Sequence, residues 1–160
     1  MNPIELSGPR LIVVCGLPGS GKTTHATGIA AQFGAVRLCP DEWMAALSID
    51  LHDEGKRGKV EALQWALGQE LLARCLVCSV EWGTWGRGER DVLRLQARAL
   101  GAAVELHYLT ASIDVLFDRI QRRRREEPPI TRESLVEWSQ KFQEPEQVEI
   151  ALYDRVVLHK

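Results

Sequence analysis

A short apolar run that passes through a glycine-rich turn into a helix-forming stretch constrains this chain more than any other feature. Residues 11–15 (LIVVC) have the apolar, β-branched composition of a buried strand, and residues 22–33 have helical composition. The turn at 16–23, GLPGSGKT, matches G-x-x-x-x-G-K-[ST]. A strand, this loop and a helix in succession predict a site where backbone amides and a helix N-terminus surround phosphate oxygens.

The residue types of the loop suit a nucleoside triphosphate. Glycines let backbone N–H groups turn inward around phosphate oxygens, because no side chain obstructs the approach. We expect Lys22 to bridge the β- and γ-phosphates, Thr23 to ligate Mg²⁺, and Thr24 to support the helix or the phosphates nearer the base. The expected ligands are ATP and Mg²⁺. The predicted binding residues in the loop are Gly16, Leu17, Pro18, Gly19, Ser20, Gly21, Lys22, Thr23 and Thr24. The alternative, a chance glycine-rich turn, needs an accidental match that arises in well under about one in a hundred chains of this length.

Strands and helices alternate along the rest of the chain. Further strands are expected at 36–38, 75–80, 103–109 and 155–158, and helices from residue 40 and at 59–74, 88–100, 113–120 and 131–142. Residues 49–58 have the polar composition of a loop. The expected buried stripes are Val60, Leu63, Leu67 and Leu71 in one helix and Val92, Leu95 and Ala99 in another. This order predicts an α/β fold in a single domain over 1–160, with helices on both faces of a parallel sheet and ligands beyond the carboxyl ends of its strands.

Composition excludes several classes of protein. Hydrophobic residues make up 45% and charged residues 26%, which is unlike a disordered chain, and the net charge of −2 disfavours binding to nucleic acid or anionic membranes by bulk charge. The longest apolar run, 11–15, is too short to span a bilayer, so we expect a cytoplasmic protein. Cys75 and Cys78 fall in one predicted strand and would point to opposite faces. Buried free thiols, Cys15 and Cys39 included, are therefore expected in place of zinc or a disulfide.

Four segments resemble a family of small P-loop kinases that includes the 5′-hydroxyl polynucleotide kinase domain, chloramphenicol phosphotransferase, zeta toxins and short AAA-type ATP-binding proteins. They are CGLPGSGKTT, LCPDEW, VEWGTWGRGERD and LHYLTASIDVLFDRIQRRR. The resemblance implies a three-layer, nucleoside-kinase-like fold with a five-stranded sheet and a helical lid. It also implies that Asp41 is the general base for an acceptor hydroxyl. The alternative role for Asp41 is a helix N-cap.

The same resemblance assigns roles around the transferring phosphate. Glu81 stands where relatives commonly carry an aspartate in the Mg²⁺ shell, and it could serve through water; the alternative is a solvated strand end. The arginine run at 122–125 resembles the lid that supplies an arginine to the phosphate, whereas a charge run alone suits a solvated helix end. Arg119 and Arg123 match the family positions best, with Arg123 in the catalytic role and Arg119 at the nucleotide.

The sequence says less about the acceptor, the molecule that would receive the phosphoryl group. Trp82 and Trp85 could stack on a planar acceptor, although core packing is favoured slightly, and Arg87 and Arg90 could contact an acidic substrate. Polynucleotide kinases carry a phosphate-holding arginine three residues past the base, where this chain has Met44. That difference favours a less charged small molecule over a nucleic-acid 5′ end. The expected function is an ATP-dependent kinase acting on a hydroxyl; the alternative is a nucleotide-binding regulatory or toxin-like ATPase with a protein partner.

Overall fold

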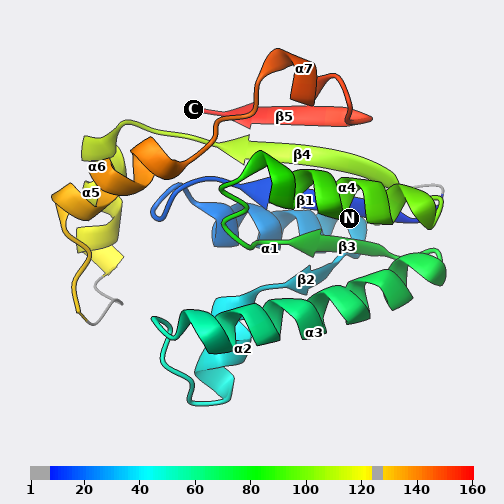
Figure 1. Ribbon diagram of the computed structural model, residues 1–160, viewed down its shortest axis with the longest axis horizontal. Coiled ribbons are helices and arrows are strands. Elements are labelled where there is room, and N and C mark those ends of the chain that lie inside the picture. The colour runs from blue at the N-terminus through cyan, green and yellow to red at the C-terminus, as the bar shows by residue number, and fades with distance from the viewer. Residues whose placement is uncertain (1–7, 124–127) are drawn as a thin grey trace.

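The computed structural model describes residues 8–123 and 128–160, and five parallel strands form its centre (Figure 1). The strands lie in the order β2-β3-β1-β4-β5. Their bounds are β1 Arg10–Cys15, β2 Val36–Leu38, β3 Val77–Val80, β4 Ala103–Leu109 and β5 Arg155–His159. The predicted parallel five-stranded sheet is therefore confirmed.

Helices cover both faces of this sheet (Figure 1). Their bounds are α1 Lys22–Phe33, α2 Pro40–Ala46, α3 Glu54–Ala73, α4 Arg87–Ala99, α5 Ile113–Arg123, α6 Arg132–Lys141 and α7 Gln147–Ile150. Alternate residues of β1 point to opposite faces: Ile12 and Val14 pack with α1, whereas Leu11 and Val13 pack in the cluster that includes residues of α3 and α4. The predicted three-layer arrangement is confirmed. No helix in the described part of the chain is long and apolar enough to cross a bilayer.

The lid region consists of α5 and α6, which lie together beyond the carboxyl ends of the strands (Figure 1). Leu116 and Ile120 of α5 pack against Leu135 of α6 in a small apolar cluster of their own. Thr131 begins α6 by accepting a hydrogen bond from the Ser134 backbone N–H at 3.1 Å. Residues 124 and 125 of the arginine run lie outside the described residues.

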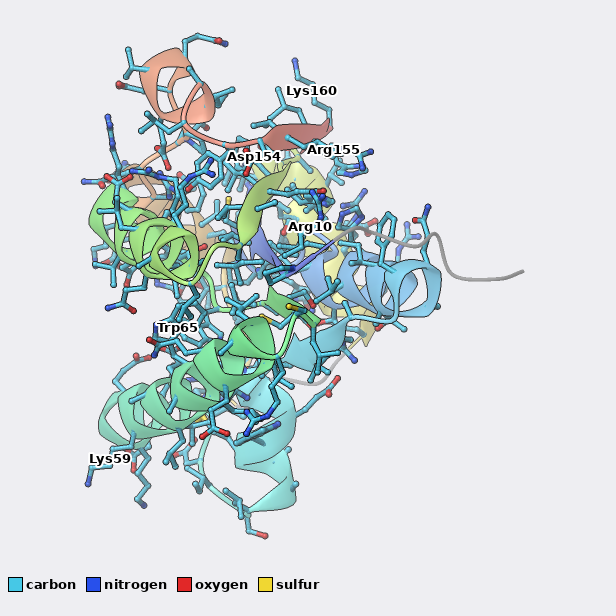
Figure 2. The ribbon with its side chains drawn as sticks, turned by 90° about the vertical axis from the view of Figure 1, so that its right-hand side faces the viewer. Arg10, Lys59, Trp65, Asp154, Arg155 and Lys160 are labelled. Carbon is cyan, nitrogen blue, oxygen red and sulfur yellow. The ribbon has the colours of Figure 1, made fainter. Side chains whose placement is uncertain are left out.

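A row of polar side chains on the α1 face of the sheet joins β1, β4 and β5. Figure 2 shows Arg10 and Arg155 near each other, and both approach the buried carboxylate of Glu105, at 2.5 and 3.9 Å. Glu105 also contacts His107 Nε2 at 3.0 Å, and His107 Nδ1 lies 2.8 Å from His25 Nε2 on α1. This chain of side chains ties the first turn of α1 to β4.

The sequence prediction was wrong about which faces of two helices are buried. On α3, Leu63 is 65% exposed and Leu67 is exposed as well, while the buried residues are Val60, Gln64, Trp65, Gly68 and Leu72. On α4, Val92 and Leu95 are exposed, and Arg90, Leu93, Arg94 and Ala97 are buried. The buried sides of both helices therefore carry polar or charged groups that the apolar pattern did not indicate.

Several predicted boundaries also need correction. The polar stretch at 49–58 is only partly a loop, because Asp53 accepts a hydrogen bond from the Lys56 backbone N–H and starts α3 at Glu54. Cys75 is exposed, with φ of +60°, in the turn before β3, so it is neither a strand residue nor a buried thiol. The other three cysteines are buried and free, as expected. The short helix α7 was not predicted.

Candidate functional site

The glycine-rich loop leaves β1 at its carboxyl end and enters α1, and two of its glycines lie against neighbouring backbone. Gly16, with φ of +149°, would bring a Cβ atom into collision with the Leu109 carbonyl of β4. Gly19, with φ of +81°, would place a Cβ atom 2.7 Å from the Leu116 carbonyl of α5. Glycine is required at both positions by space as well as conformation. The loop is thereby held between the end of β4 and the lid helix α5.

Lys22 is the first residue of α1 and turns back across the loop. Its Nζ donates to the carbonyls of Gly16 at 2.8 Å and Leu17 at 3.0 Å. An ammonium group has three donors, so a third can reach a phosphate oxygen. Burial lowers the pKa of Lys22 to about 8, and the negative charge of Asp41 opposes this decrease. The guanidinium of Arg123 also acts on the Lys22 ammonium, in the lowering direction. Asp41 of α2 and Arg123 of α5 thus influence the charge state of Lys22 in opposite directions.

Asp41 lies in the first turn of α2, immediately beyond β2. The N-cap prediction for Asp41 was wrong, because α2 begins at Pro40 with Cys39 in the cap position and no side-chain cap bond. The Asp41 side chain is 63% exposed, and its Oδ1 accepts a hydrogen bond from Arg57 Nη2 at 2.6 Å. Its Oδ2 accepts no hydrogen bond from the described residues. An exposed carboxylate held through one oxygen leaves the other oxygen for a substrate.

Glu81 follows β3 and is buried, so the alternative of a solvated strand end was wrong. Its side chain is 1% exposed and accepts two hydrogen bonds from Arg37, from Nε at 2.7 Å and from Nη2 at 3.0 Å. Arg37 also pairs with Glu42 at 2.9 Å. The sequence prediction missed Arg37, a lone cation between apolar neighbours in a predicted strand. This two-point contact fixes the Glu81 carboxylate and compensates its charge.

The oxygen donors near the loop suit Mg²⁺, which prefers hydroxyl and carboxylate oxygens and keeps several water ligands. Thr23 and Thr24 are both exposed in the first turn of α1, beside Lys22. The Thr23 hydroxyl would hold the ion, and Glu81, with its carboxylate already bound by Arg37, would act through water. Within residues 8–123 and 128–160, no group of three or more His, Cys, Asp or Glu is arranged to hold a metal ion.

The arginines at the end of α5 differ in their surroundings. Arg119 Nη1 donates to the Gly19 carbonyl of the loop at 3.5 Å, and Arg123 acts on Lys22 as described above. Arg122 instead points to solvent and pairs with Asp118, one turn earlier, at 2.8 Å. Arg119 therefore faces the loop, and Arg123, four residues further along α5, lies on the same face of the helix.

The tryptophans after β3 have partners within the protein. Trp82 Nε1 donates to Gln64 Oε1 at 3.0 Å, and its ring meets Trp65 edge-on with centroids 6.3 Å apart. Trp85 lies 5.9 Å from Trp138 of α6, centroid to centroid. Both Trp82 and Trp85 remain half-buried beside the core. Contacts within the protein therefore cover most of each ring, in agreement with the prediction that core packing is favoured slightly over stacking on an acceptor.

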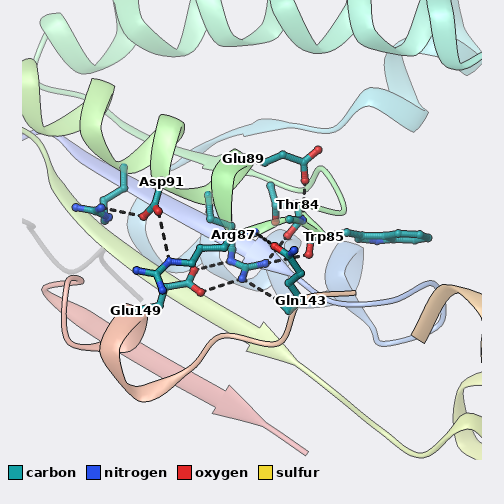
Figure 3. Close-up of polar contacts among 10 residues, drawn as sticks. Thr84, Trp85, Arg87, Glu89, Asp91, Gln143 and Glu149 are labelled. Atoms are coloured by element: carbon teal, nitrogen blue, oxygen red, sulfur yellow. Dashed lines mark hydrogen bonds and ion pairs between the residues drawn. The ribbon is translucent and has the colours of Figure 1, made fainter. Parts of the chain in front are cut away.

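Arg90 cannot contact a substrate as suggested from the sequence, because its side chain is 0% exposed. Three of the residues that surround it, Thr84, Gln143 and Glu149, are labelled in Figure 3. Its Nε and Nη2 donate to the two carboxylate oxygens of Glu149 at 2.6 and 2.9 Å. Further donors reach the carbonyls of Thr84 and Gln143, each at 2.8 Å. Arg87 is partly exposed and pairs with Asp91 at 3.4 Å. Arg90 thus joins the loop after β3 to the segment after α6.

Comparisons with known proteins agree with this architecture. A family model described as an AAA domain matches residues 11–145. No curated protein matches the chain significantly in sequence. A gluconokinase from Sinorhizobium meliloti 1021 has a TM-score of 0.61 at 24% identity, with 96% of this chain and 83% of that chain covered. Kti12 from Chaetomium thermophilum, in complex with ADP-AlF3, has a TM-score of 0.68 at 22% identity and coverages of 92% and 87%. A chain of the Pnkp1/Rnl/Hen1 RNA repair complex has a TM-score of 0.70 at 18% identity and coverages of 94% and 48%. At these identities the likeness shows a shared fold.

Proposed function

The chain belongs to the AAA domain family, and we propose that it is an ATP-dependent kinase that transfers the γ-phosphoryl group to a hydroxyl of a small molecule or of a nucleic-acid 5′ end. The observation that carries this proposal is the Lys22 ammonium folded back across the glycine-rich loop, with Asp41 in the first turn of α2 just beyond the carboxyl end of β2. A loop for phosphates, a carboxylate for the acceptor and an arginine for the transferring group are the parts that phosphoryl transfer requires.

Each side chain has a role in the proposed reaction. The acceptor hydroxyl oxygen forms a bond to the γ-phosphorus while the bond from that phosphorus to the β,γ-bridging oxygen breaks. ADP leaves with the electron pair, and the hydroxyl proton passes to Asp41 and then to solvent. Lys22 and Arg123 stabilise the negative charge on the phosphate oxygens, and Arg119 holds the nucleotide beside Gly19. Thr23, and Glu81 through water, would hold Mg²⁺, and the bound ion would supply positive charge to stabilise the phosphates.

The test follows the labelled γ-phosphate of ATP, with Mg²⁺, over a panel of sugars, nucleosides, hydroxylated antibiotics and 5′-hydroxyl oligonucleotides. Transfer to one class of acceptor is expected, and Asp41→Asn should reduce it by roughly 10²–10⁴-fold while ATP binding persists. Asp118→Asn is a matched control, because Asp118 is also an exposed aspartate paired with an arginine. Equal rates of transfer by the Asp41→Asn and Asp118→Asn variants would refute the assignment of Asp41 as the general base. Release of label to water alone would favour the regulatory alternative and direct the search to a protein partner.

A further inference from the structure

The N-terminal half of α3 presents polar side chains where a helix packed on a sheet normally presents apolar ones. Arg57, Glu61 and Gln64 are spaced four and three residues apart and therefore share one face of the helix. The Arg57 side chain is 23% exposed, Glu61 is half-buried, and Gln64 is fully buried. We refer to these three residues as the polar stripe.

The polar stripe is connected to the candidate active site through Asp41. Arg57 Nη2 donates to Asp41 Oδ1 at 2.6 Å and to the Leu51 carbonyl at 3.1 Å. Asp41 in turn acts electrostatically on Lys22 of the phosphate-binding loop. At the other end of the stripe, Gln64 accepts from the indole N–H of Trp82 at 3.0 Å. The stripe thus runs from the proposed general base to an aromatic ring that follows β3.

The polar stripe contains hydrogen-bond donors and acceptors that no described residue uses. Arg57 uses only Nη2, and its Nε and Nη1 donate to no other described residue. The Glu61 carboxylate accepts no hydrogen bond within residues 8–123 and 128–160, although burial raises its pKa and the Arg57 charge opposes that increase. The buried Gln64 Nε2 has no partner in the described part of the chain. Buried polar groups are normally paired, so the unpaired Gln64 Nε2, on the same helix face as the unused donors of Arg57 and the unused carboxylate of Glu61, indicates a polar ligand.

The charges around the polar stripe disfavour an anionic ligand. Asp41 and Glu61 carry two negative charges on either side of Arg57, and the Arg57 guanidinium is already bound to Asp41 Oδ1. A phosphate or carboxylate on the acceptor would face these negative charges at close range. Hydroxyl groups both donate and accept, and so match a row in which arginine and amide donors alternate with a carboxylate acceptor.

We propose that the polar stripe binds the acceptor, and that the acceptor is a polyhydroxylated small molecule without phosphate or carboxylate groups, such as a sugar or a sugar-like polyol. This inference rests on the kinase function proposed above. One hydroxyl meets Asp41 Oδ2, its neighbours bond to Arg57 and Glu61, and the apolar face of the ring or chain lies toward Trp82. Selectivity for a neutral acceptor arises from the surrounding carboxylates.

The experiment compares matched acceptors in the labelled-phosphate assay: neutral hexoses and alditols, the same sugars carrying a phosphate or carboxylate, and 5′-hydroxyl oligonucleotides. Transfer to neutral polyols is expected. Glu61→Gln removes the charged acceptor of the stripe and should raise the acceptor KM by about 10- to 100-fold, with the ATP KM and the thermal midpoint unchanged. Glu70→Gln on the same helix is the control, since Glu70 is an exposed glutamate paired with Arg74.

The outcomes separate this inference from the proposed function. Transfer only to phosphorylated, carboxylated or oligonucleotide acceptors would overturn the inference and leave the kinase intact. If the acceptor KM of Glu61→Gln equals that of Glu70→Gln, the polar stripe does not bind the acceptor, and the inference is likewise overturned. If the label reaches no acceptor at all, the kinase proposal itself fails, and the inference fails with it.

Discussion

Glu149→Gln is expected to destabilise the protein strongly, although Glu149 lies in a short helix that follows the lid. The carboxylate accepts two hydrogen bonds from the guanidinium of Arg90, at 2.6 and 2.9 Å, and both side chains are almost completely buried. A glutamine of the same shape accepts only one of these bonds, turns N–H donors toward the other, and leaves a buried positive charge uncompensated. Breaking a buried ion pair from one side costs about 3–5 kcal/mol. For a chain of this length, that loss corresponds to a decrease in Tm of about 6–20 °C.

Thermal and urea unfolding followed by circular dichroism measures this effect. The control is Glu70→Gln, which removes a surface pair whose partners are 66% and 65% exposed and should change the free energy of unfolding by less than about 1 kcal/mol. Replacing both partners, Arg90→Met with Glu149→Leu, should recover most of the loss, because no unpaired charge then remains buried. If Glu149→Gln lowers Tm no more than Glu70→Gln does, the carbonyls of Thr84 and Gln143 alone satisfy Arg90, and the reasoning is wrong.

The remaining predictions concern Lys22. Lys22→Ala should weaken transition-state stabilisation by about 3 kcal/mol, measured as kcat/KM for ATP in the transfer assay, and near-normal turnover would refute the phosphate role. Because burial lowers the pKa of Lys22 from 10.5 to about 8, the ammonium is lost as pH rises through this value, and affinity for an ATP analogue should fall between about pH 7 and about pH 9. Lys22→Arg should flatten this dependence. Between these two pKa values the unfolded chain keeps a proton that the folded chain has released, so this group makes the free energy of unfolding rise with pH there; a fall attributable to Lys22 would contradict the assignment.

Sequence alone predicted those parts of the fold that depend on local patterns. The loop, its flanking strand and helix, and the parallel sheet follow from glycine spacing, short apolar runs and strand–helix alternation, which act over a few residues. The resemblance to small P-loop kinases is confirmed by the AAA domain match and by the kinase folds among the similar structures. The roles of Lys22, Asp41 and Arg123 stay predictions.

Features set by distant partners could not be predicted. Arg90 is buried because Glu149 meets it from 59 positions away, and Glu81 is paired because Arg37 meets it from a neighbouring strand. The helix α3 carries apolar residues on two sides, so periodicity could not show that Trp65 and Leu72 face the core while Leu63 does not. In each case the burial or pairing of the side chain depends on which surface the tertiary fold places against it.

The position of α5 against the phosphate-binding loop has a kinetic consequence. Arg119 bonds to Gly19 within the same chain, and Gly19 in turn lies against the backbone of α5. Arg119 therefore accompanies the loop in every molecule and does not arrive with a second subunit. Turnover per molecule should then be independent of protein concentration, and dilution should leave specific activity constant. An enzyme that borrowed its arginine from a neighbour would instead lose activity as the assembly came apart.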